Sequence, residues 1–398
     1  METNCWNLTC MTRLAHLRTA LVVATLAWSA QAADNATQPA VVPHLVYDGE
    51  AFADLAGGLR RGTTYLGTLR FRVTVDGSRL AGVPGMTVYV EGLNIHGGHP
   101  SSFAGDAQGV SNLEGPARSM LYEGWIQQNL FRDRLSILVG RYDLNTEFYR
   151  LQSAGLFLNS SFGIGPEFSQ SGRNGPSIFP NTSVGARIAW KPVRSVVVRA
   201  ATFDGGLLVS EFAYLFRADA KDTSPHNPHF RLGRMAGLPP YTAKIALGTW
   251  HYSGKVPDLR EPVQHEGSSG AYVLADVTVY KDSARPSRRV SLFGQFGIGD
   301  ARVNRFARYT GAGVVMSGPL KARENDELGV AIAVAHNGGH FAAGRFVTRA
   351  ETTFECSYLA PITSHLAIQP DVQYVIHPDT DRARKNALVA SLRFELSF

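Results

Sequence analysis

The segment Tyr65–Asp76 alternates regularly enough to define its local structure. Apart from Gly67, every second position is apolar: Tyr65, Leu69, Phe71, Val73 and Val75. Apart from Leu66, the positions between them are polar: Thr68, Arg70, Arg72, Thr74 and Asp76. A period of two over about twelve residues predicts a β-strand with one wet face. Because two arginines would be costly in a dry sandwich core, we expect this face to line water.

The same alternation recurs along the chain. It is found at 135–140, 184–190, 290–298, 350–357 and 366–374. About fifteen such segments can be marked, and single-chain bacterial barrels close with an even number of strands. The sequence therefore predicts an all-β fold, a transmembrane antiparallel up-and-down β-barrel of about sixteen strands. We expect the unmarked strand between Leu93 and Tyr122.

The chain ends in another alternating segment. Six apolar residues occupy every second position: Leu388, Ala390, Leu392, Phe394, Leu396 and Phe398. A terminal strand that ends in phenylalanine resembles the C-terminal assembly signal of outer-membrane proteins. We therefore expect the barrel assembly machinery to recognise Phe398, although an ordinary last strand could also end in this way.

The N-terminus has the pattern of a secretory signal peptide. Arg13 and Arg18 give a basic start, Leu21–Trp28 is a short apolar run, and Ala30-Gln31-Ala32 is a cleavage site. Met11 is a second possible start. The predicted organisation is a signal peptide at 1–32, a periplasmic or plug-like segment at 33–56 and the barrel at 57–398.

Composition agrees with export and with a barrel. The mean hydropathy is −0.09, as expected where each strand alternates lipid-facing and lumen-facing residues. After the signal peptide, no stretch has 18 uninterrupted apolar residues. Removal of Cys5 and Cys10 would leave Cys356 alone, so no thiol metal cluster or intrachain disulfide is expected. The net charge of +6 is spread over single arginines, which does not indicate nucleic-acid binding.

The connections alternate between short and long. Lys191–Arg194 and Asp282–Pro286 are typical tight turns. Long connections are predicted at Leu144–Asn181, Asp219–Pro240 and Val256–Gly270. The first of these begins where Arg141–Phe162 loses the period of two. It is predicted to be a loop, either folded inward to narrow the pore or placed outside.

Strand parity identifies candidate residues of the solute pathway. A sugar needs fork-like donors, carboxylate acceptors and an aromatic plate, and it must bind weakly enough to leave. The pathway candidates that offer these groups are Arg70, Arg72, Glu91, Glu123, Trp125, Gln127, Arg141 and Glu147. Asn129 is expected on the same strand face as Glu123, and Tyr122 on the other face. No metal or other cofactor is expected.

Several motifs resemble those of the carbohydrate-selective porins of the OprB type. They are GGLRRGT at 57–63, GLNIHGG at 92–98, GDAQGVSN at 105–112, GRYDLNTEF at 140–148, SGP at 317–319 and IQPDVQYVIHP at 368–378, followed by Asn386 and Ala387. The resemblance implies a sixteen-stranded outer-membrane barrel and passive diffusion of small sugars such as glucose. The chain lacks the tryptophan-rich opening of some members.

Other functions stay open at this stage. An arginine-rich lumen would favour anions, so a general or anion-leaning porin is one alternative. A barrel-borne outer-membrane hydrolase is a second, although the sequence has no G-x-S-x-G, H-E-x-x-H or P-loop motif. A secreted soluble all-β binding protein is a third. The expected partners are carbohydrates and outer-membrane lipid, and the chain could act as a monomer or a homotrimer.

Overall fold

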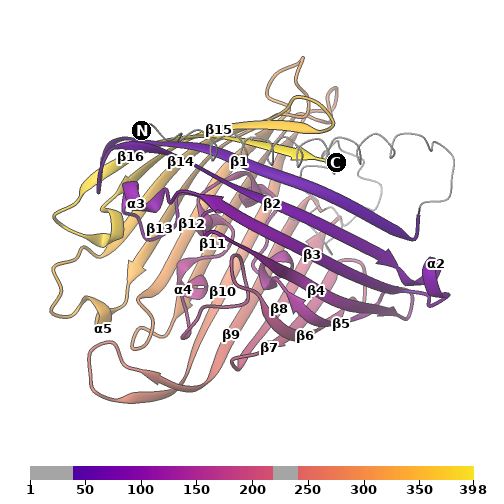
Figure 1. The fold of residues 1–398 in the computed structure, drawn as a ribbon, viewed down its shortest axis with the longest axis horizontal. Helices are drawn as coiled ribbons and strands as arrows, with labels where there is room; N and C mark the ends of the chain where they lie inside the picture. Colours follow the sequence, from indigo (N-terminus) through magenta and orange to yellow (C-terminus); the bar gives the residue numbers. More distant parts are fainter. Residues whose placement is uncertain (1–38, 218–240) are drawn as a thin grey trace, which may run out of the picture.

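A computed structural model describes residues 39–217 and 241–398, whose strands close into one antiparallel barrel (Figure 1). Each strand pairs with its sequence neighbours, and β1 also pairs with β16, which closes the wall. The strands are β1 (Val41–Gly58), β2 (Gly62–Asp76), β3 (Met86–Gly97), β4 (Arg118–Leu130), β5 (Leu135–Tyr142), β6 (Ser183–Trp190), β7 (Val196–Phe203), β8 (Leu207–Phe216), β9 (Ala243–Pro257), β10 (Gln264–Lys281), β11 (Arg289–Gly299), β12 (Phe306–Ser317), β13 (Glu327–Asn337), β14 (Ala350–Pro361), β15 (Leu366–Ile376) and β16 (Lys385–Ser397). The prediction of a sixteen-stranded barrel is confirmed.

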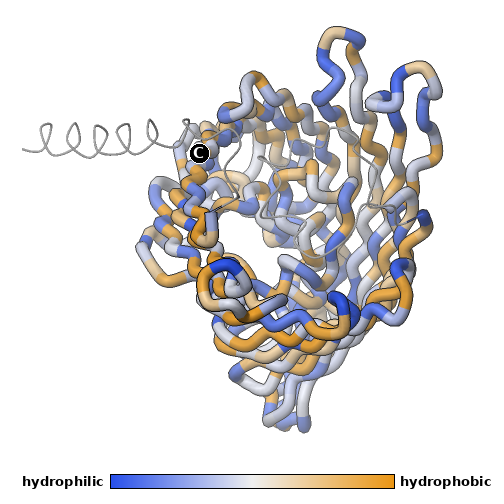
Figure 2. The backbone as a smooth tube through the Cα atoms, turned by 90° about the vertical axis from the view of Figure 1, so that its right-hand side faces the viewer, coloured by the Kyte–Doolittle hydropathy of each residue, from blue (hydrophilic) through white to orange (hydrophobic). Residues whose placement is uncertain are grey.

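The alternation predicted from the sequence is the inside and outside of this wall. Along β2, Tyr65 and Phe71 are exposed on the outer face, whereas Thr68 on the inner face is fully buried. Figure 2 shows the consequence along the backbone, where hydrophobic and hydrophilic residues succeed one another around the ring of strands. Closure leaves no unpaired sheet edge. A sheet whose outer face meets lipid needs this closure, because unpaired backbone groups find no hydrogen-bond partners there.

Successive connections alternate between the two rims of the barrel. We call the rim with the connections 98–117 and 143–182 the loop rim, and the opposite one the turn rim. The predicted tight turns at 191–195 and 282–288 lie on the turn rim. The short helices are all in connections: α2 (Gly77–Ala81), α3 (Ser101–Ala104), α4 (Pro166–Ser169), α5 (Gly339–Ala342) and the 3₁₀ turns Leu144–Thr146, Ser153–Leu156, Ser160–Phe162 and Pro378–Thr380.

Three expectations about segment boundaries were wrong. The segment 33–56 is not a plug as far as it is described, because residues 41–58 form β1 and pair with both β2 and β16. No strand lies between β3 and β4, where residues 98–117 instead fold into the barrel. The expected long loop Val256–Gly270 is mostly strand, because β9 and β10 extend as a hairpin and leave only 258–263 as connection.

Two other predicted segments, the signal peptide at 1–32 and the connection Asp219–Pro240, lie outside the described residues. Among the residues that the structure covers, no helix combines the length and the apolar character needed to cross a membrane.

The connection 143–182 folds into the barrel and fills one side of it. Its apolar side chains are buried: Leu144, Phe148, Tyr149, Leu151, Leu156, Phe157, Phe162 and Phe168. They form one cluster with inward residues of the wall, such as Val209 of β8, Trp250 of β9 and Phe293 of β11. Phe168 stacks on Trp250 with ring centroids 5.2 Å apart. This packing explains why the inner face of β8, apart from Glu211, is apolar like most of its outer face. It also restricts open space to the opposite side of the barrel.

Candidate functional site

A cavity of about 400 Å³ lies on the side of the barrel that the loop leaves open. Its wall residues come from β1, β2, β4 and β16, and its remaining residues come from the connections 98–117 and 143–182. Its charged residues are of both signs: Asp48, Arg70, Arg72, Asp143, Arg150 and Glu395. This is the candidate constriction of a solute pathway.

Three of the predicted pathway residues form one cluster, in which Arg70 and Arg72 line the cavity and the buried Glu91 is paired with both. Arg70 and Arg72 share the inner face of β2, and Glu91 lies opposite Arg72 in the register of β2 with β3. Glu91 Oε1 is 3.2 Å from Arg70 Nη1, and its Oε2 is 3.0 Å from Arg72 Nε. One carboxylate thus orients both guanidinium groups, whose other N–H donors can face the lumen.

Aromatic rings flank Arg70. The guanidinium carbon lies 5.7 Å from the ring centroids of both Tyr122 and Phe179. Tyr122 was predicted to face the other side of β4, and that prediction was wrong. The register of β3 with β4 shifts between Glu91 and Gly92, so a β-bulge turns both Tyr122 and Glu123 inward.

Glu123 and Trp125 continue this cluster toward the turn rim. Trp125 Nε1 donates to Glu123 Oε2 at 3.1 Å, and its ring stacks on Tyr89 with centroids 4.9 Å apart. The Tyr89 hydroxyl donates to Glu91 at 2.5 Å, which joins the two carboxylates through one aromatic pair. The predicted acceptor and aromatic plate are therefore neighbours of the paired arginines.

The loop 143–182 supplies the facing side of the cavity. Asp143 accepts a hydrogen bond from the Tyr122 hydroxyl at 2.6 Å, and its backbone N–H donates to Glu123 at 3.2 Å. Burial raises the pKa of the Asp143 carboxyl. Arg150, from the same loop, also lines the cavity. No alternating pattern marks Arg150 or Asp143, so strand parity could not identify them.

Gln127 and Glu147 meet at a second polar cluster, around Arg187 of β6. The Arg187 guanidinium donates to Glu147 Oε2 at 2.7 Å and to Gln127 Oε1 at 2.7 Å. None of the three lines the cavity described above. On the inner wall, Arg187 therefore joins the partly buried Gln127 of β4 to the buried Glu147 of the loop.

Arg141 does not face the lumen, which corrects its assignment to the pathway. β5 continues in register to Tyr142, whose side chain is buried inside. The alternation therefore places Arg141 outward, opposite the exposed Val184 of β6. Its guanidinium donates to the backbone carbonyl of Thr182.

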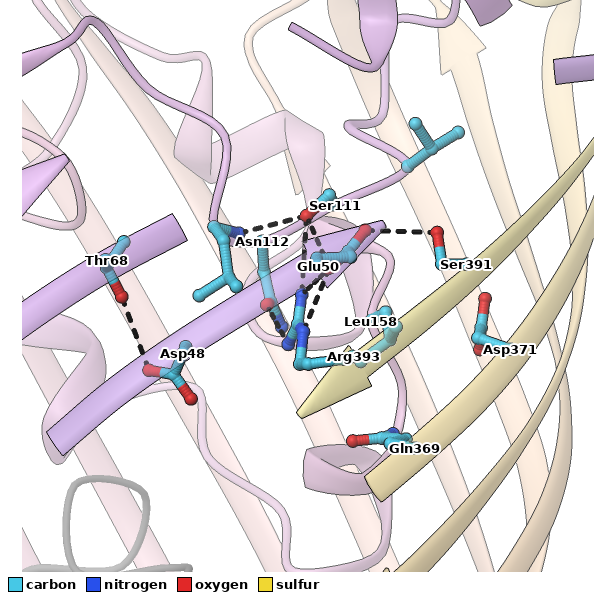
Figure 3. Close-up of polar contacts among 12 residues, drawn as sticks. Asp48, Glu50, Thr68, Ser111, Asn112, Leu158, Gln369, Asp371, Ser391 and Arg393 are labelled. Atoms are coloured by element: carbon cyan, nitrogen blue, oxygen red, sulfur yellow. Dashed lines mark hydrogen bonds and ion pairs between the residues drawn. The ribbon is translucent and has the colours of Figure 1, made fainter. Parts of the chain in front are cut away.

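The connection 98–117 is held against the wall by an ion pair that the sequence did not single out. Arg393 of β16 donates to Glu50 of β1 at 2.6 and 2.9 Å (Figure 3). Ser111 Oγ donates to the same carboxylate at 3.0 Å, and Asn112 Oδ1 accepts from Arg393 at 2.8 Å. Glu50 was missed because the segment 33–56 was not predicted to be a strand.

Carboxylates of the wall accept hydrogen bonds from backbone amides of both inward loops. Glu211 accepts from Tyr149 N at 2.9 Å, and Asp276 accepts from Ser153 N at 3.0 Å. The others are Glu355 with the amides of Leu158 and Asn159, and Glu351 with those of Ala107 and Gln108. These anchors set the distance between the loops and the wall, and hence the width of the passage.

Such a site can orient a polar solute without reacting with it. The charged groups at the cavity include arginines already paired to a carboxylate, so a neutral polyhydroxylated molecule would meet donors, acceptors and aromatic faces without a strong net charge. Within 39–217 and 241–398, no group of three or more His, Cys, Asp or Glu side chains is placed to hold a metal ion.

Comparison with known proteins places the chain in a family. A family model described as "Carbohydrate-selective porin, OprB family" matches residues 60–398. Porin B of Pseudomonas aeruginosa is 27% identical over 183 residues, which are 38% of this chain and 40% of that protein. Porin AaxA of Chlamydia caviae is 23% identical over 229 residues, which are 56% of this chain and 46% of that protein. The chain thus spans less than half the length of these two relatives.

A solved structure supports the same fold. The high-pH structure of Pseudomonas putida OprB superimposes with a TM-score of 0.78 at 19% identity, covering 90% of this chain and 94% of that one. Salmonella typhi OmpF gives a TM-score of 0.55 at 8% identity. Because the family model covers nearly the whole barrel, the chain belongs to the OprB family of carbohydrate-selective porins.

Proposed function

We propose that this chain is an outer-membrane porin through which small sugars, such as glucose-like monosaccharides, diffuse passively into the periplasm. The observation that carries the proposal is the cavity beside Arg70, Arg72 and Glu91, which joins paired charges to the rings of Tyr122 and Phe179. Weak, multiple hydrogen bonds of this kind suit a solute that must enter and leave. Membership of the family adds support from independent evidence.

The pathway residues have distinct proposed roles. Arg70 and Arg72 donate to sugar hydroxyls, Glu91 holds the two guanidinium groups, and Glu123 with Trp125 offers an acceptor beside an aromatic face. Gln127 and Glu147 act at one remove, through Arg187. Arg141 has no role in the pathway.

Liposome swelling tests the proposal. Purified protein in proteoliposomes is expected to admit monosaccharides faster than trisaccharides, because the constriction is narrow. Single-channel current in planar bilayers is expected to fall as glucose is added. Protein that is folded but gives no solute permeability would contradict the channel function itself.

An anion-leaning porin is the nearest alternative. The cavity has three arginines among its lining residues, against Asp48, Asp143 and Glu395. We infer a nearly balanced field and hence weak ion selectivity. The reversal potential in a salt gradient distinguishes the two, because a strongly anion-selective value would favour the alternative.

A hydrolase on the outer wall requires a serine and a histidine that face lipid, and one such pair exists. Ser269 Oγ lies 2.8 Å from His251 Nδ1 on neighbouring outward positions of β10 and β9. We favour a channel without catalysis, because strand amides engaged in the ladder cannot stabilise an oxyanion. Labelling of Ser269 by a fluorophosphonate probe would support the hydrolase.

The remaining proposals concern export and assembly. The chain is proposed to be exported by its N-terminal signal and inserted by the barrel assembly machinery through Phe398. The Phe398 side chain is half exposed at the turn rim, and its backbone pairs with Leu45 of β1. Monomer and homotrimer both remain compatible with the outer face, and cross-linking in the native membrane distinguishes them.

A further inference from the structure

One charged side chain interrupts an otherwise uncharged stretch of the outer wall. The outward rows of β11, β12 and β13 consist of Val290, Leu292, Gly294, Phe296 and Ile298; Arg308, Thr310, Ala312, Val314 and Met316; and Leu328, Val330, Ile332, Val334 and His336. Only Arg308 carries a permanent charge. It is exposed, and it lies near the end of β12 at the loop rim.

The neighbour of Arg308 in the register extends this feature to a second strand. Arg308 is paired with His336 of β13, and His336 is paired with Ala350 of β14. The outward rows of β11, β12 and β13 contain no Asp or Glu, and no ion pair joins Arg308 to another described residue.

Beside Arg308 and toward the turn rim, the outer wall is apolar. Ile298, which is paired with Arg308, is 47% exposed, and Val330 and Phe354 are similarly exposed on the neighbouring strands. The surface therefore changes from exposed aliphatic and aromatic side chains to arginine over a few residues. A membrane lipid has the same arrangement, because its apolar acyl chains end at a charged headgroup.

An unpaired arginine is costly on a lipid-facing wall, and the cost falls toward the interface. A phosphate group supplies the countercharge there, and the planar guanidinium matches its oxygens with two parallel donors. His336 can add a further donor to the same group. Zwitterionic headgroups also carry phosphate, but their ammonium groups cancel its net charge.

We propose that Arg308 and His336 bind the phosphate of an anionic membrane lipid at the loop rim, with its acyl chains against the apolar wall. The site lies on the outer face and is separate from the solute pathway. It would fix a lipid at one place on the wall of β12 and β13.

Native mass spectrometry of the full protein in non-ionic detergent tests the proposal. The probes are dioleoyl-phosphatidylglycerol and dioleoyl-phosphatidylcholine, added in equal amounts. The wild type is expected to retain phosphatidylglycerol in preference. The R308Q/H336Q variant is expected to lower that preference about tenfold, as for the loss of one charge-assisted hydrogen bond. R308K, which keeps the charge, is expected to retain most of it.

Arg141 provides the matched control, because it is another outward arginine at the loop rim and already donates to a backbone carbonyl. R141Q removes the same charge elsewhere and is expected to leave the preference unchanged. Heat-dependent migration of each variant in detergent gels reports that the barrel is folded.

Several outcomes would overturn the proposal. They are equal retention of the two lipids by the wild type, an unchanged preference in folded R308Q/H336Q, or an equal loss in R141Q. Displacement of phosphatidylglycerol by inorganic phosphate at the same concentration would also overturn it, because the site would then hold a small anion rather than a lipid.

Discussion

Asp276 is predicted to hold the first part of the inward loop in place. Its carboxylate, on the inner face of β10, accepts from Ser153 N at 3.0 Å and from Ser153 Oγ at 2.7 Å. The Tyr241 hydroxyl donates to it at 3.1 Å. All three partners are buried, and the carboxylate contacts the loop through the 3₁₀ turn Ser153–Leu156. Replacing it with alanine leaves the Ser153 amide without an acceptor.

The expected cost follows from these bonds. A hydrogen bond to a charged group contributes about 1.5–3 kcal/mol, and the two from Ser153 together about 3–6 kcal/mol. Because the serine hydroxyl can rotate and lumen water can reach the gap, we expect a net loss of about 2–4 kcal/mol in D276A. Asparagine keeps an acceptor, so D276N is expected to lose only about 1–2 kcal/mol.

Single-channel recording and urea unfolding measure the two consequences. D276A is expected to show more current noise and larger open levels, because the loop leaves the wall, and a lower free energy of unfolding. T278A is the matched control: Thr278 lies on the same strand, and its hydroxyl bonds to Ser291 of the wall rather than to the loop. If D276A matches T278A in both noise and stability, Asp276 does not anchor the loop.

Two further predictions concern the pathway, and a third concerns the stability of the inward loop. Glu123→Ala and Trp125→Ala are each expected to change sugar flux in swelling assays more than Thr74→Ala, which removes an inner-face residue away from the cavity; equal effects would argue against the assigned constriction. Glu91→Gln leaves two arginines of β2 without their carboxylate, so the reversal potential in a salt gradient should shift toward anion selectivity, and an unchanged value would refute this pairing. Burial raises the pKa of Glu167 to about 7, so this carboxyl stabilises the folded state most when the pH is below its ordinary pKa, near 4.5. About 3 kcal/mol of stability should therefore be lost as the pH rises from 4.5 through 7. A Glu167→Gln variant with the same pH dependence of unfolding would contradict this.

The barrel wall could be predicted from the sequence because its signal is local. A period of two needs only neighbouring residues, and Tyr65–Asp76 already separates lipid from water. The inward orientation of the Arg70, Arg72 and Glu91 side chains follows from the same alternation, and the structure brings these three together.

The remainder of the site depends on contacts that no local pattern carries. A one-residue bulge turns Tyr122 inward, so the alternation of faces along β4 cannot be counted across this point. Arg141 was misplaced because β5 runs two residues further than the predicted strand, to Tyr142. The fold of the inward loop depends on partners distant in sequence, such as Glu355 with the amides of Leu158 and Asn159.

The wall carboxylates recognise the inward loops through main-chain N–H groups, which every residue except proline possesses. Where only the main chain makes the bond, as at Leu158 and Ala107, the side chain is free to change without loosening the loop, provided that the backbone conformation is kept. Ser153 and Ser111 differ, because their hydroxyl groups also donate to wall carboxylates. Lumen chemistry and loop attachment are thus specified by separate parts of the chain. A barrel built in this way can acquire a different solute preference through substitutions at the tip of the loop, while its anchors in the wall stay as they are.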